Sequence, residues 1–76
     1  MKIPRDVSSD QLIKLLQDLG YEVVRQRGSH VRLSYEGKHF ITVPAHRNLK
    51  VGLLKAILKE VASYHEISIE DLIRKL

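Results

Sequence analysis

A helix that stops abruptly, followed at once by strand-forming residues, constrains this chain more than any other feature. Ser8 can cap the first turn of that helix, with Gln11 as its partner in a capping box, and Gly20 supplies the left-handed residue that commonly ends a helix. Between them, leucines recur at helical spacing and form one apolar face: Leu12, Leu15, Leu16 and Leu19. The pattern predicts a helix over residues 9–19.

Short strand-forming segments follow, separated by turns that contain glycine. The segments with β-branched and aromatic side chains are residues 21–27, 30–35 and 39–43. Gly28 and Ser29 suit a two-residue hairpin loop, since glycine at the first position favours a type II′ turn. A second turn is predicted at 36–38, and Pro44 ends the last strand because proline has no N–H to donate.

The rest of the chain predicts two more helices. A loop over 45–48 leads to a helix from about residue 50 to 62, and Ser68 can cap a short C-terminal helix. The order α-β-β-β-α predicts one α+β domain over 1–76, a three-stranded antiparallel sheet with both main helices on one face. The expected core contains Leu12, Leu16, Leu33, Ile41, Leu54 and Ile57.

The register of the predicted hairpin sorts its side chains onto two faces. A loop of Gly28 and Ser29 alone places Val24 opposite Leu33, on a core face that also holds Val31. The other face then collects Arg25, Arg27, His30, Arg32 and Ser34, with Phe40 and Thr42 from the third strand. Arginines that bind phosphate and an aromatic ring that stacks on bases make this a candidate RNA surface. An ordinary solvated sheet face is the alternative.

Positive charge is concentrated in one block of the sequence. The chain has a formal net charge of +4, from 13 Lys+Arg and 9 Asp+Glu. Residues 25–50 hold six of the bases and one of the acids, a charge of +5, so the rest of the chain sums to −1. A concentrated block favours a polyanionic partner such as RNA or DNA, although a surface with a basic bias has the same composition.

Composition argues against several other classes. No cysteine is present, which excludes disulfides and thiolate metal sites and fits a reducing cytoplasm. The start, MKIPRDVSSD, lacks the apolar stretch of a signal peptide, and no apolar run approaches the roughly 18 residues of a membrane helix. The histidine spacing matches no metal site, and no nucleotide-binding motif occurs. We therefore expect no metal and no small-molecule cofactor.

His30 is the histidine with the clearest chemical opportunity. RNA carries its own nucleophile, because a general base can take the proton of a 2′-hydroxyl, which then attacks the adjacent phosphorus. Neighbouring arginines can stabilise the negative charge that develops on the phosphorane. His46 can act as a second acid, base or phosphate ligand if its loop folds back toward His30. A lone surface histidine with no function is the alternative.

Several short motifs resemble those of the HicA family, the small toxins of bacterial and archaeal toxin–antitoxin modules, also called YcfA-like proteins. They are Gly20-Tyr21, then RQRGSH at 25–30, Thr42-Val43-Pro44 with His46, Leu49-Lys50 with Gly52, and Leu54 with Ile57-Leu58-Lys59. Their order and spacing cover most of the chain, from the first helix through the second. The residues beside Gly52 and the tail beyond Ala62 depart from the family pattern.

The resemblance implies a fold like that of a double-stranded-RNA-binding domain and metal-independent cleavage of messenger RNA. It makes His30, the histidine of the G-S-H motif, the catalytic residue, and it implies a HicB-type antitoxin protein as a second partner. We predict that RNA or phosphate binds around this histidine at Arg25, Arg27, Gly28, Ser29, Arg32, His46 and Lys50.

Two other function classes stay open at this point. A non-catalytic RNA-binding module predicts salt-sensitive binding that is weakened by changing Arg25 or Arg32, without cleavage. A protein-binding domain, whose basic face docks an acidic partner, predicts no affinity for RNA at low salt.

Overall fold

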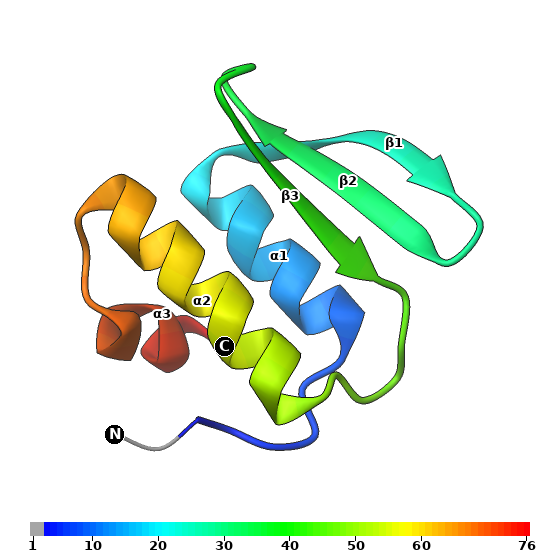
Figure 1. The fold of residues 1–76 in the computed structure, drawn as a ribbon. Coiled ribbons are helices and arrows are strands. Elements are labelled where there is room, and N and C mark those ends of the chain that lie inside the picture. The colour runs from blue at the N-terminus through cyan, green and yellow to red at the C-terminus, as the bar shows by residue number, and fades with distance from the viewer. Residues whose placement is uncertain (1–2) are drawn as a thin grey trace.

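The computed structural model describes residues 3–76. Its elements are α1 (Ser9–Leu19), β1 (Tyr21–Arg27), β2 (His30–Tyr35), β3 (His39–Pro44), α2 (Val51–His65) and α3 (Ile69–Lys75). The strands form one antiparallel sheet in the order β1-β2-β3. Figure 1 shows α1 and α2 on the same face of this sheet, with α3 beside α2. The predicted α+β fold class and its element order are confirmed.

Both ends of α1 carry the predicted caps. The Ser8 hydroxyl accepts a hydrogen bond from the Gln11 N–H, and the Gln11 side chain accepts one from the Ser8 N–H, which completes the capping box. Gly20 ends the helix with φ +112°. A Cβ at this glycine would lie 3.0 Å from the Tyr35 ring, so both its backbone and its surroundings require glycine.

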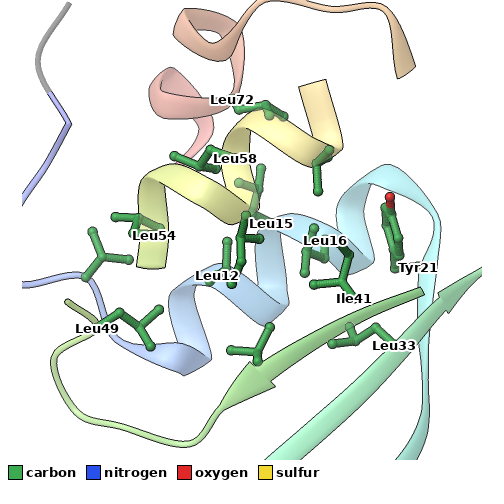
Figure 2. Close-up of a cluster of buried hydrophobic side chains, with 14 of the residues drawn as sticks. Leu12, Leu15, Leu16, Tyr21, Leu33, Ile41, Leu49, Leu54, Leu58 and Leu72 are labelled. Carbon is green, nitrogen blue, oxygen red and sulfur yellow. The ribbon is translucent and has the colours of Figure 1, made fainter. Parts of the chain in front are cut away.

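The core lies between the helices and the inner face of the sheet, the face on which α1 and α2 pack. Figure 2 shows leucines of α1 between the leucines of α2 on one side and Leu33 of β2 and Ile41 of β3 on the other. The residues predicted for this core, Leu12, Leu16, Leu33, Ile41, Leu54 and Ile57, are all buried. Leu72 of α3 is also fully buried and extends the core beyond α2 (Figure 2).

The register of the sheet confirms both predicted turns and corrects one residue. Arg27 pairs with His30 across the Gly28-Ser29 loop, and the second turn places Ile41 opposite Leu33. The prediction that Val24 lies opposite Leu33 is wrong, because a β-bulge between residues 23 and 25 gives that place to Val23. Val24 is 51% exposed. An extra residue in one strand shifts every pairing beyond it.

α2 begins close to its predicted start and runs three residues beyond its predicted end at Ala62. The additional turn holds Tyr64 and His65, whose rings pack on aromatic side chains of the sheet. Glu66 ends the helix in the left-handed conformation. Across residues 3–76, no helix is long and apolar enough to cross a membrane.

Candidate functional site

The outer face of the sheet, the face opposite α1 and α2 (Figure 1), carries the predicted arginines. The antiparallel register aligns its side chains in rows that cross the three strands. These rows are Arg27–His30–Pro44, Arg25–Arg32–Thr42 and Glu22–Ser34–Phe40. The bulge in β1 puts Glu22 and Arg25 on the same face although an odd number of residues separates them.

Positive charge dominates this face. Arg25, Arg27 and Arg32 are exposed, and Glu22 is the one acidic side chain in the rows that the described strands form. The ion pairs found within residues 3–76 lie elsewhere, so none neutralises these arginines. Arg25 and Arg32 stand directly opposite each other, an arrangement that repels unless an anion lies between them.

His30 lies where the hairpin loop meets β2. Gly28 has φ +56°, the left-handed value that a type II′ turn needs at its first position, and Ser29 does not adopt it. The His30 side chain is exposed and, among the residues described, has no hydrogen-bond partner. Its imidazole is thus free to meet a ligand beside Arg27.

Main-chain hydrogen bonds fasten the loop that follows β3 to the hairpin and to α1. The N–H of Ala45 donates to the carbonyl of Ser29 at 2.6 Å, so the loop that bears His46 starts beside the hairpin turn. The carbonyl of His46 then accepts from the N–H of Ser9, at the start of α1, at 3.0 Å. These bonds bring the His46 loop to the same end of the sheet as His30.

A pocket of about 300 Å³ opens beside this loop. It is lined by His46, Asn48, Lys50 and Leu53. Lys50 is the residue that precedes the first turn of α2, and its side chain makes no capping hydrogen bond. The predicted set therefore occupies two adjoining surfaces, the arginines and His30 on the outer face and His46 with Lys50 in the pocket.

Arg32 makes contacts within the outer face that its position in the sequence alone does not predict. Its guanidinium carbon lies over the Phe40 ring, 4.7 Å from the centroid. One guanidinium nitrogen is also 3.5 Å from the hydroxyl of Thr42, its partner across the strands. Ser34 is buried despite its outward register, and its hydroxyl accepts from the N–H of Gly37.

A second group of polar side chains, which sequence reasoning missed, lies at the other end of the sheet. We call it the aromatic–histidine cluster: Tyr21, Tyr35, His39, Glu60, Tyr64 and His65. The Tyr21 hydroxyl is 2.6 Å from Nδ1 of His39 and 3.0 Å from Nε2 of His65. Nε2 of His39 is 3.1 Å from the Glu60 carboxylate. These residues come from four separate elements, so no local sequence motif indicates that they lie together.

Burial and mutual charge shift two pKa values in the cluster. Burial, followed by the negative charges of Tyr64, Glu60 and Tyr35, raises the pKa of Tyr21 to about 12. Burial also lowers the pKa of His65, helped by the neighbouring His39 and opposed by Glu36. The cluster thus favours a neutral tyrosine beside a neutral histidine, as expected for groups whose hydrogen bonds connect α2 to the sheet.

Comparison with known proteins identifies the family. Residues 9–62 match the family described as the HicA toxin of bacterial toxin–antitoxin systems. The match covers α1, the whole sheet and most of α2. No curated protein and no solved structure gave a significant match.

Proposed function

Since the chain belongs to the HicA family of toxins of bacterial toxin–antitoxin modules, we propose that it is an endoribonuclease that cleaves messenger RNA. The observation that carries the proposal is the position of His30, which is exposed and unpartnered among the described residues on a face rich in arginine. A messenger RNA supplies the polyanion that this face attracts and the 2′-hydroxyl that an imidazole can activate.

In the proposed mechanism, His30 acts as the general base. Its neutral imidazole takes the proton of a ribose 2′-hydroxyl, the 2′ oxygen forms a bond to the adjacent phosphorus, and the bond from phosphorus to the 5′ oxygen breaks. The products carry a 2′,3′-cyclic phosphate and a 5′-hydroxyl. The leaving 5′ oxygen needs a proton, which we assign to His46 because its loop starts beside Ser29. The reaction uses a nucleophile internal to the RNA and therefore needs no metal ion.

The arginines supply the electrostatic part of the proposal. Arg27, opposite His30 in the register, is the nearest candidate to stabilise the charge on the phosphorane. Arg25 and Arg32 bind neighbouring phosphates, and an anion between them relieves their mutual repulsion. Lys50 contacts the RNA backbone from the pocket, and the Gly28-Ser29 loop lets the backbone approach closely because it presents no bulky side chain.

The family membership implies an antitoxin partner. We propose that this partner is a HicB-type protein that covers the outer face and so blocks access of RNA to His30. The exposed polar side chains of the outer face make few contacts within the toxin. A partner protein can therefore bind them without unfolding the toxin.

Cleavage of RNA in the presence of EDTA tests the proposal. Purified protein should produce fragments with 2′,3′-cyclic phosphate ends, and His30→Ala should lower the rate by about 10²–10⁴ while circular dichroism stays unchanged. RNA with 2′-O-methyl riboses is the matched substrate control, because it lacks the nucleophile and should resist cleavage.

Three results would contradict this function. Equal activity of His30→Ala would remove His30 from the mechanism. Cleavage of 2′-O-methyl RNA would show that the 2′-hydroxyl is not the nucleophile. Salt-sensitive binding without any cleavage would identify a non-catalytic RNA-binding module instead.

A further inference from the structure

The contact between Arg32 and Phe40 combines a planar cation with an aromatic ring on the outer face. Phe40 is 42% exposed, although large apolar side chains of a sheet usually face the core. The Arg32 guanidinium lies 4.7 Å from its centroid and reaches Thr42 with one nitrogen. Both contacts limit the orientations of a side chain that is otherwise flexible.

A guanidinium held in this way has a chemical use that a lysine ammonium lacks. Guanidinium planes and aromatic rings both stack on nucleobases, and such stacking is a common way to bind unpaired RNA. We propose that Arg32 and Phe40 form a stacking site for one unpaired nucleobase of the RNA. The inference rests on the proposed function in that it takes RNA as the ligand, and it adds the part of the RNA that binds and the residues that bind it.

The distance along β2 suits a base next to the cleaved position. Arg32 is two residues from His30 in the same strand, which separates their Cα atoms by about 7 Å. Both side chains project from the same face, as the register shows. A chain of RNA with its phosphate at His30 therefore has an adjacent nucleotide within reach of Arg32.

The surroundings of the Arg32–Phe40 pair favour unpaired RNA over duplex RNA and over an apolar protein surface. Bases in a duplex are stacked on one another and do not offer a free face to Arg32 or Phe40. The exposed positions of α1 include two acids, Asp10 and Asp18, and one base, Lys14. This helix therefore offers no basic surface to the phosphates of a duplex.

Phe40 shares its row with Glu22 and Ser34 and lies beneath Arg32. It is therefore not the apolar centre of a stable protein interface, and an antitoxin on this face would bind mainly through its polar groups.

Replacement of arginine by lysine separates stacking from charge. Arg32→Lys keeps the positive charge and loses the planar group, and Arg25→Lys is the matched control because Arg25 occupies the same row with no aromatic ring found beneath it in the described chain. In a His30→Ala background, which leaves RNA intact, Arg32→Lys should raise the Kd for a short unstructured oligoribonucleotide about 5- to 50-fold. Arg25→Lys should raise it by a smaller factor than Arg32→Lys, and neither should alter the salt dependence.

A second measurement varies the RNA, again in the His30→Ala background, and compares the parent surface with variants of the pair. Oligoribonucleotides that each lack one base should bind less tightly when the missing base is the stacked one, and Arg32→Lys should abolish this difference. Phe40→Ala should resemble Arg32→Lys, and Phe40→Trp should bind like the parent. The complementary duplex should bind more weakly than the single strand.

Several outcomes would overturn the stacking site. Equal affinity of Arg32→Lys and Arg25→Lys for RNA would show that Arg32 acts only through its charge. Tighter binding of the duplex than of the single strand would show that the bound base is not an unpaired one. Loss of antitoxin binding with unchanged RNA affinity would make the pair a protein contact. Failure of the proposed function is distinguishable, because a protein that binds RNA without cleaving it can still show the difference between the two lysine variants.

Discussion

The hydroxyl of Tyr21 in β1 lies 2.6 Å from Nδ1 of His39 in β3, two strands away. The Glu60 carboxylate can only accept, so Nε2 of His39 donates to it, and when the His39 ring carries this one proton its Nδ1 accepts from the Tyr21 O–H. The Tyr21 oxygen then accepts from Nε2–H of His65. One proton lies in each bond, and the chain runs from His65 through Tyr21 and His39 to Glu60.

Removal of the Tyr21 hydroxyl should destabilise the protein without changing its activity. Tyr21→Phe keeps the buried ring and leaves one nitrogen of each histidine without its partner, which costs about 1–3 kcal/mol in the free energy of unfolding. Urea denaturation measures this loss. Cleavage of RNA at full rate by the folded variant is expected, because the cluster and His30 lie at opposite ends of β2.

Alkaline titration provides a control for the same variant. The folded-state pKa of Tyr21, about 12, lies above the unfolded value of about 10. The unfolded chain therefore loses its proton first, and stability falls as the pH rises from about 10 toward 12. Tyr21→Phe should lose less stability than the parent over this interval. An identical alkaline loss in both proteins would contradict the assignment.

Acidification should weaken the cluster through His65. Its pKa in the folded protein is lowered by burial and by His39, so below about pH 6.5 the unfolded chain binds a proton that the folded chain does not. The free energy of unfolding should therefore fall as the pH decreases from 8 to about 5. His65→Gln, which cannot titrate, should show a shallower decrease in urea denaturation than the parent. An equal slope for His65→Gln and the parent would contradict the prediction.

Two glycines should respond in opposite directions to the same substitution. Gly20→Ala places a Cβ at φ +112° and 3.0 Å from the Tyr35 ring, which should destabilise the protein by about 1–3 kcal/mol. Gly52→Ala lies in the first turn of α2, where the added carbon meets nothing within 4 Å apart from its chain neighbours and the backbone of its own helix. It should stabilise the protein by up to about 1 kcal/mol, because alanine favours the helix. Thermal or urea unfolding of the two variants gives the comparison.

Arg25→Ala should improve stability while it weakens RNA binding. Arg25 stands opposite Arg32, so its removal relieves a like-charge pair and should add about 0.2–1 kcal/mol to the free energy of unfolding at low salt. The same change removes one phosphate contact, and the slope of log K against log salt should decrease by about one. A stabilising effect without any change in the salt slope would show that Arg25 does not contact RNA.

The features that were predicted from the sequence are those set by neighbouring residues. The capping box of α1 joins Ser8 to Gln11 three residues away, and the length of the Gly28-Ser29 loop determines which residues pair across the hairpin. The bulge at Val24 was not predictable, because the residue types around it are the same as those of a regular strand. Its exposed valine has the same β propensity as a buried one.

The aromatic–histidine cluster escaped prediction for a different reason. Tyr21 and His65 are 44 residues apart in the chain, and only the packing of α2 on the sheet brings them together. The sequence around His39 and His65 indicates a function less clearly than the sequence around His30. The outward face of the hairpin, in contrast, followed from local pairing, so the row of Arg25 and Arg32 was predicted correctly although their binding of RNA stays a prediction.

The loop between β3 and α2 is held by its backbone. The bonds from Ala45 to Ser29, from Ser9 to His46 and from Leu49 to Val7 all join main-chain atoms. Side chains at positions 47 and 48 can therefore change without loosening the loop, and proline at a donor position is the substitution that removes a bond. A protein engineer could therefore build a library of substitutions at these positions. The library would vary the lining of the pocket, while the main-chain bonds keep the loop in place beside the hairpin that bears His30.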